Sequence, residues 1–144
     1  MLIMFAVTYQ IPIGPLKDIK SFLIETLGPS LAECRWYDLV WVAFLAGCSE
    51  ELLFRAVLQT WMNPWGWLAA LLVSNLLFGV AHAVTPLYAV LAGLLGVYLG
   101  ALFQFAGDGN LLVPTLTHAL YDLVAFVVVR RSFLAGQLQV GPVE

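Results

Sequence analysis

The sequence predicts an all-α protein, a polytopic transmembrane helical bundle with about four core spanning helices and an N-terminal amphipathic segment. Three observations support this class: 62% of the 144 residues are hydrophobic, only 10% are charged, and four long apolar segments follow one another with brief turns between them. Soluble domains contain about 25% charged residues, and their surfaces need those polar groups. Composition therefore excludes a soluble domain, and the net charge of −3 argues against a nucleic-acid partner.

The first 38 residues form a membrane-surface or partial N-terminal segment. Residues 1–15 are apolar but shorter than the roughly 17–25 residues that span a bilayer, and they lack the basic start of a signal peptide. They are either an interfacial stretch or part of a helix of a longer chain. Residues 16–38 carry charged and apolar side chains in alternation, which predicts an amphipathic surface helix that breaks near Gly28-Pro29.

The remaining chain is expected to form one four-helix catalytic core, residues 39–131, within a single domain that covers residues 1–144. Turn signals rich in Asn, Pro and Gly separate the apolar segments, and such short connections predict antiparallel neighbours. Small residues such as Gly93, Gly96 and Gly100 predict close helix contact along the third segment. Trp61, Trp65 and Trp67 predict an interfacial belt. The four spans are expected at 39–62, 67–83, 87–106 and 111–129.

The distribution of basic residues predicts the topology. Lys17, Lys20 and Arg35 precede the first span, and Arg130 and Arg131 follow the last, whereas Asp108 lies in a loop on the opposite side. The positive-inside rule places both ends of the four-span core on the cytoplasmic side. We expect an integral, multi-pass protein of a bacterial plasma membrane or a thylakoid or organelle membrane, with membrane lipid as a partner. Nothing in the sequence indicates the oligomeric state.

Six ionisable side chains lie inside the expected spans, where each charge costs roughly 2.5–3.5 kcal/mol on insertion scales. Such groups must face the bundle interior or a wet cavity, and they are candidates for a functional site. Residues four apart share a helix face, and three such intervals occur on three spans. The six candidate catalytic residues are Glu50, Glu51, Arg55, His82, His118 and Asp122.

Spacing suggests how these groups divide the chemistry. Glu51 and Arg55 can pair, whereas Glu50 is rotated by about 100° and escapes that pairing. Glu50, with His82, would act as general base on a water, and His118 and Asp122 would stabilise the oxyanion or orient the substrate. Glu50, His82 and His118 could instead hold a divalent metal such as zinc, although no HExxH motif is present. The simplest alternative is a set of buried polar links between helices.

The motifs that carry these residues occur together and in order. Glu50-Glu51-Leu52-Leu53-Phe54-Arg55 matches EExxxR, Phe78 to His82 matches FxxxH, and His118 to Asp122 matches HxxxN/D. The chain thereby resembles the CPBP family (CAAX protease and bacteriocin-processing, or Abi, intramembrane proteases), which includes the type II CAAX prenyl endopeptidases. The resemblance implies peptide-bond hydrolysis in the membrane by a Glu/His-activated water. Because the HExxH motif is missing, we expect no obligatory metal.

The resemblance assigns roles by position and shows two departures. Glu51 and Arg55 would support the Glu50 carboxylate, and His118 and Asp122 would form the oxyanion side. Asp122 stands where Asn is common, and an ionised carboxylate cannot donate a hydrogen bond; Ala56 stands where Gly often follows the arginine. The expected substrate is a membrane-associated peptide or protein, with CAAX-type processing as one option. The rival functions are a non-catalytic scaffold, immunity or regulatory protein, and an ion-conducting bundle.

Overall fold

The computed structural model describes residues 1, 9–11, 14–106 and 109–140, and all regular elements in these ranges are helical, which confirms the all-α part of the predicted fold class. Most of residues 1–15 and Asp108 lie outside the described part, so the expectations for them stay predictions. The elements are α2 (Gly14–Glu33), α3 (Trp36–Glu51), the π-helical segment η1 (Leu52–Gln59), α4 (Thr60–Met62), the 3₁₀ turn η2 (Asn63–Trp65), α5 (Trp67–Ala81), α6 (Pro86–Ala101), the π-helical segment η3 (Leu102–Ala106) and α7 (Leu112–Val140).

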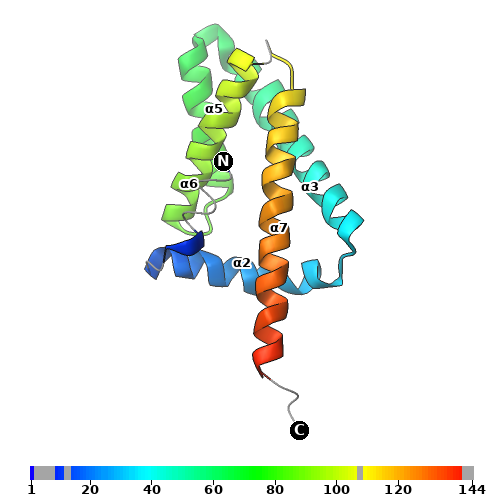
Figure 1. The fold of residues 1–144 in the computed structure, drawn as a ribbon. Coiled ribbons are helices and arrows are strands. Elements are labelled where there is room, and N and C mark those ends of the chain that lie inside the picture. The colour runs from blue at the N-terminus through cyan, green and yellow to red at the C-terminus, as the bar shows by residue number, and fades with distance from the viewer. Residues whose placement is uncertain (2–8, 12–13, 107–108, 141–144) are drawn as a thin grey trace.

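Two pairs of helices form the bundle (Figure 1). α5 and α6 pack against each other along one side, and α3 packs against α7 on the other. α2 runs across the foot of the bundle and packs mainly on α7. The start of α3 and the C-terminal half of α7 lie at this same foot. The polar side chains of the four helices meet between the two pairs.

Two helical stretches have the length and composition of membrane spans: Pro86–Ala106 with 21 residues and Leu112–Leu138 with 27. α5 is apolar but has 15 residues, fewer than the roughly 20 that cross a bilayer. The continuous helical stretch from α3 to α4 is longer, but Glu50, Glu51 and Arg55 interrupt its apolar character. Two of the four expected spans are thus supported, and the other two stay predictions.

The distribution of side chains is inverted relative to a soluble protein. Trp41 is 62% exposed, Leu76 67% and Leu94 57%, while Glu51 and Arg55 are 0% exposed. Exposed apolar surface of this extent marks contact with a partner or a membrane, and charged groups inside a membrane bundle face its interior. The three tryptophans expected at an interface are exposed near the turn between α4 and α5.

The expected break near Gly28-Pro29 is wrong, because α2 continues through Pro29 to Glu33. Proline lacks an N–H, so the carbonyl four residues earlier loses its helical donor. That carbonyl belongs to Glu25, which is exposed and can bond water instead. Gly28 is buried, and a Cβ there would lie 2.6 Å from the Phe133 ring of α7. The glycine therefore permits a close crossing of α2 and α7 rather than a turn.

The fourth helix also differs from its expected range. It does not end at Arg130-Arg131 but continues to Val140, because Val129 and Phe133 pack on α2. The short connection before it does not make it a close neighbour of α6: the two helices touch little, and α7 packs on α3 and α2 instead. This separation of α6 from α7 leaves room beside the polar residues.

The small residues of α6 do form the expected close contact. A Cβ on Gly96 would lie 2.5 Å from Asn75 Oδ1, and a Cβ on Gly100 would lie 2.6 Å from Leu71 Cδ1. Backbones that approach this closely expose their carbonyl groups to side chains of neighbouring helices. The Gly96 and Gly100 carbonyls are used in this way by the polar network described below.

Candidate active site

Two adjacent carboxylates at the end of α3 form the centre of the site. Glu51 is the last residue of α3, and the helix continues without a break into the π-helical segment η1. One turn earlier, Gly47 faces α7, where a Cβ would lie 3.0 Å from the Ala119 backbone nitrogen. This close approach brings the carboxylates beside His118. Because successive residues point about 100° apart on a helix, Glu50 and Glu51 enter different surroundings.

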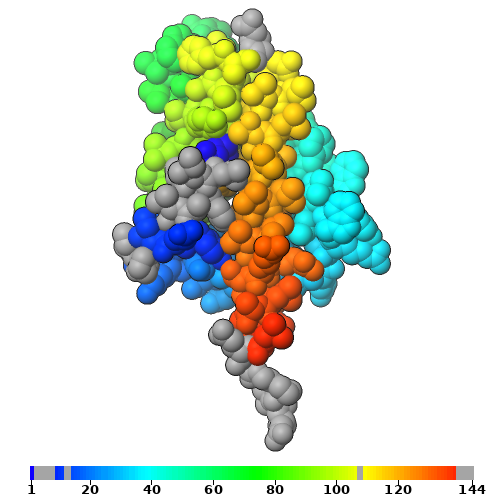
Figure 2. All heavy atoms as spheres, viewed as in Figure 1, coloured from blue at the N-terminus to red at the C-terminus, as the bar shows by residue number. Residues whose placement is uncertain are grey.

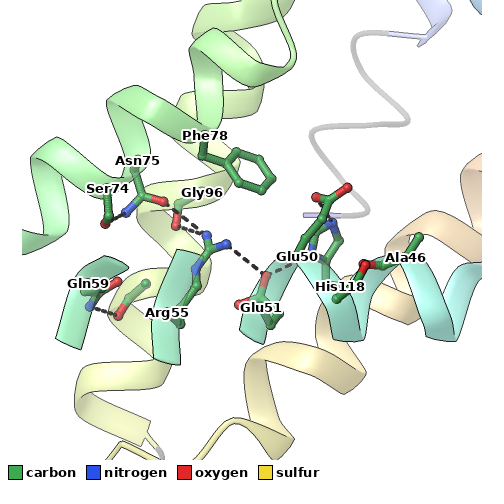
Figure 3. A network of polar contacts seen from close by, with 12 residues as sticks. Ala46, Glu50, Glu51, Arg55, Gln59, Ser74, Asn75, Phe78, Gly96 and His118 are labelled. Carbon is green, nitrogen blue, oxygen red and sulfur yellow. Dashed lines mark hydrogen bonds and ion pairs between the residues drawn. The ribbon is translucent and has the colours of Figure 1, made fainter. Parts of the chain in front are cut away.

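Glu51 belongs to a closed polar layer, in which Glu51, Arg55, Asn75 and the Nδ1 side of His118 contact one another (Figure 3). Its Oε1 lies 3.0 Å from Arg55 Nη1 and 2.8 Å from His118 Nδ1. Glu51 and Arg55 are 0% exposed and His118 is 6% exposed. An isolated buried charge is costly, but opposite charges with good hydrogen bonds compensate each other. Glu51 therefore neutralises Arg55 and, by accepting from Nδ1–H, fixes the ring orientation of His118.

Arg55 is also held from its far side. Its Nη2 donates to Asn75 Oδ1 at 3.1 Å and to the Gly96 carbonyl at 2.7 Å. One turn on, Gln59 donates to the Gly100 carbonyl at 3.2 Å. Arg55 and Gln59 both lie in η1, and π-helical turns are rare and concentrate at functional sites. The wider winding of this segment thus accompanies two polar side chains that reach the backbone of α6.

The Phe78 ring contacts Arg55 of the closed layer and His82 of a second group of polar side chains. The Arg55 guanidinium lies 4.9 Å from the Phe78 ring centroid, within the range of a cation–π contact. The His82 ring stacks on the same ring, with centroids 4.4 Å apart and an interplanar angle of 28°. The edge-on Phe54 ring completes the packing at 4.9 Å. Phe78 therefore positions His82 by direct contact and lines the site.

The second group is the open layer, which consists of Glu50, His82, His118 and Asp122. Glu50 Oε2 lies 3.5 Å from His82 Nε2 and 3.8 Å from His118 Nε2, and His118 Nε2 lies 3.8 Å from Asp122 Oδ2. These separations are longer than good hydrogen bonds. Glu50 Oε2 is buried and has no hydrogen-bond partner among the protein atoms of the described residues. A buried acceptor of this kind normally bonds water or a ligand.

The tautomers of both histidines follow from their other contacts. His82 Nδ1 lies 2.8 Å from the Phe78 carbonyl, so Nδ1–H donates to that oxygen. His118 Nδ1–H donates to Glu51 in the same way. Both rings consequently present Nε2 to the Glu50 carboxylate. A neutral Nε2 can accept a proton, and a protonated Nε2 can donate a hydrogen bond, so the open layer can perform acid–base chemistry.

An apolar cavity of about 150 Å³ adjoins the open layer. His82, His118 and Asp122 line one part of it, and aliphatic and aromatic side chains of α2, α6 and α7 line most of the rest. Tyr88 also lines this cavity, near the start of α6, where its N–H donates to the capping Thr85 hydroxyl at 3.1 Å. A mostly apolar pocket with a few convergent polar groups is the usual form of a binding site.

Three side chains of the open layer could hold a metal ion. Glu50, His82 and His118 offer one carboxylate and two imidazoles, a donor set that zinc accepts. However, across residues 1, 9–11, 14–106 and 109–140, no three His, Cys, Asp or Glu side chains come together as a metal-binding group. The mechanism below is derived from the side chains alone. Metal dependence stays a prediction.

The structure brings all six candidate residues into two connected layers. Glu51 and Arg55 pair as their spacing predicted, and Glu50 points away from that pair. The expected support of Glu50 by Glu51 takes a different form, since Glu51 contacts Arg55 and His118. Sequence reasoning missed Asn75 and Gln59. Asn75 lies three residues before Phe78 and seven before His82, so helical spacing could have placed it on their face.

The fold and the two layers together define a class, a helical membrane protein with a buried acid–base cluster beside an apolar cavity. Residues 32–124 match the family described as type II CAAX prenyl endopeptidase Rce1-like, and this match covers more than half of the chain. The protein therefore belongs to this family of membrane-embedded proteases, which confirms the resemblance seen in the motifs. No curated protein and no solved structure gives a significant match.

Proposed function

We propose that the protein is an intramembrane endopeptidase that hydrolyses a peptide bond with a water activated by Glu50. The observation that carries this proposal is the Glu50 carboxylate, whose unpartnered Oε2 faces the Nε2 atoms of two histidines beside a cavity. Family membership supports the same reaction class.

In the proposed reaction, Glu50 accepts a proton from the water while the water oxygen attacks the carbonyl carbon. His82 assists this transfer, because its Nε2 lies beside the same carboxylate oxygen. His118, when protonated, donates from Nε2 to the developing oxyanion. The carbon–nitrogen bond then breaks, and the proton passes from Glu50 to the leaving amine. A carboxyl group and a free amine result, so the atoms balance.

Asp122 has a positioning role in this mechanism. As a carboxylate it cannot donate to an oxyanion, but its Oδ2 lies 3.8 Å from His118 Nε2 and favours the protonated imidazole electrostatically. Glu51 orients His118 by accepting a hydrogen bond from its Nδ1, and Arg55 in turn holds Glu51. This division gives each of the six candidate residues a role that its contacts support.

For the substrate, we propose a membrane-associated peptide or protein with an apolar segment at the scissile bond, and CAAX-type processing as the specific activity. The family name supports this choice, and the mostly apolar cavity beside the open layer supports an apolar peptide. The scaffold and ion-conduction alternatives receive no specific support from the described residues.

The experiment is to compare membrane-protein termini in cells that carry the wild-type protein and in cells that carry Glu50→Gln. We expect the carboxyl termini that the wild-type protein generates to be missing in the variant. The rate of hydrolysis should fall at least about 100-fold, the usual contribution of a general base. Ser49→Ala is the matched control, because Ser49 is the exposed neighbour of Glu50. Unchanged termini in Glu50→Gln at normal membrane abundance would overturn the proposal. Retained activity after exhaustive chelation supports the metal-free form.

A further inference from the structure

The cavity beside the open layer has a second polar end, on α2. Lys20 lines this cavity together with His82, His118 and Asp122, and it is the only Lys or Arg among the described lining residues. Lys20 is half-buried, whereas Lys17, one turn earlier on α2, is exposed and does not line the cavity. One of two neighbouring lysines of α2 is therefore directed to the candidate active site.

Lys20 is held in place by an aromatic ring and not by a carboxylate. Its Nζ lies 4.1 Å from the centroid of the Tyr9 ring, a cation–π distance, and the Tyr9 hydroxyl bonds Ser132 of α7. Within the described part of the chain, no carboxylate lies within ion-pair distance of Lys20. Its positive charge is thus available to an anionic group in the cavity.

The wall between the two polar ends is largely apolar. Leu23 and Leu27 of α2, Leu95 of α6 and Phe126 of α7 contribute to it, and α2 crosses the foot of the bundle where it meets α7 (Figure 2). A ligand that fits this cavity has an apolar body, a reacting bond near His82 and His118, and a negative charge near α2. A short apolar peptide with a free C-terminal carboxylate has these three properties.

We propose that Lys20 binds the C-terminal carboxylate of the peptide that is released. This inference rests on the proposed function and adds a binding residue outside the motifs of the catalytic helices. A lysine acts as a point charge with three donors, which suits a terminal carboxylate. The phosphate of a lipid headgroup has the same charge, so the test must distinguish the two sources.

The test uses the full chain in phosphatidylcholine nanodiscs and two fluorescent peptides that end in farnesyl-Cys-Val-Leu-Ser, one with a free carboxylate and one with a carboxamide. We expect kcat/KM to be about 10- to 100-fold higher for the free acid, as for a hydrogen bond to a charged group. Lys20→Gln should lose this preference and leave the amide rate unchanged. Lys20→Arg should retain most of the preference, and Lys17→Gln should retain all of it.

Three outcomes would overturn the inference. One is an equal loss for both peptides in Lys20→Gln, and another is the same loss in Lys17→Gln. The third is an effect of Lys20→Gln that is equal for both peptides and appears only when phosphatidylglycerol is added, which assigns Lys20 to a lipid headgroup. Binding of both peptides to the Glu50→Gln protein, measured by fluorescence anisotropy, tests Lys20 even without turnover. A different result would show that the proposed function itself is wrong: the Glu50→Gln protein would hydrolyse the peptides as fast as the wild type.

Discussion

Glu50 and Glu51 are adjacent in the sequence, yet they differ in burial and in the distances to their neighbours in the open and closed layers. Glu51 is fully buried and lies within 3.0 Å of a guanidinium and 2.8 Å of an imidazole. Glu50 is partly exposed, and its neighbouring imidazoles lie 3.5 and 3.8 Å away. The Oε2 atom of each carboxylate has no hydrogen-bond partner among the described residues. Glu51 nevertheless orients Arg55 and His118 through Oε1 from a fully buried position, whereas Glu50 Oε2 lies beside the Nε2 atoms of two histidines, where it can take a proton from a water. Because adjacent residues point in different directions on a helix, two identical side chains are expected to have different roles.

The largest effect on stability is expected in the closed layer. Arg55→Leu leaves Glu51 buried without its cation, and breaking a buried ion pair from one side costs about 3–5 kcal/mol. We expect the free energy of unfolding in detergent, followed by circular dichroism, to fall by that amount. Glu50→Gln should change it by less than about 1 kcal/mol, because Glu50 is partly exposed and its contacts with His82 and His118 are long, at 3.5 and 3.8 Å. Equal losses in the two variants would break the distinction between the layers.

Replacing both partners sharpens the same comparison. The double variant Glu51→Leu/Arg55→Leu removes both charges, and exchange of a buried pair for apolar residues is often neutral or stabilising. We expect it to be more stable than Arg55→Leu alone, although hydrolysis stays impaired because His118 has lost its acceptor. A double variant less stable than either single variant would contradict this interpretation.

A smaller effect is expected at Asn75, which belongs to the closed layer but carries no charge. Asn75→Leu removes one of two acceptors of Arg55 Nη2, while the Gly96 carbonyl remains. The loss of one hydrogen bond to a charged group predicts a decrease of about 1.5–3 kcal/mol in unfolding free energy. Leu76→Ala is the matched control, since this next residue is 67% exposed. A larger loss in the control would show that helix packing, and not the polar contact, dominates.

The smallest effect is expected at Asp122 in the open layer. Asp122→Asn replaces an acceptor by a group that can also donate, and the 3.8 Å separation from His118 makes the contact weak. We expect kcat to change by less than about tenfold and KM to stay the same, both measured with the free-acid peptide. A loss as large as that of Glu50→Gln would instead place Asp122 among the residues that contact the reacting atoms.

Sequence reasoning predicted contacts within helices better than contacts between them. The Glu51–Arg55 pair follows from a four-residue interval, and the same interval places Asp122 beside His118. The contact between His118 and Glu51 joins residues that are 67 positions apart, and it depends on which helix faces meet. Asn75 escaped notice because a neutral amide costs less in an apolar helix than a charge does. Tertiary packing also explains why Pro29 and Arg130 do not end their helices.

The π-helical segment η1 makes the closed layer sensitive to insertions and deletions. An ideal α-helix turns about 100° per residue, so removing one residue between Glu51 and Gln59 would rewind the segment and rotate everything beyond it. Glu51 and its partners would then no longer share a side with Gln59. Transferring the EExxxR motif to a regular α-helix would therefore reproduce its amino acids but not its contacts with α6. Relatives of this chain should differ in the amino acids of η1 far more readily than in its length.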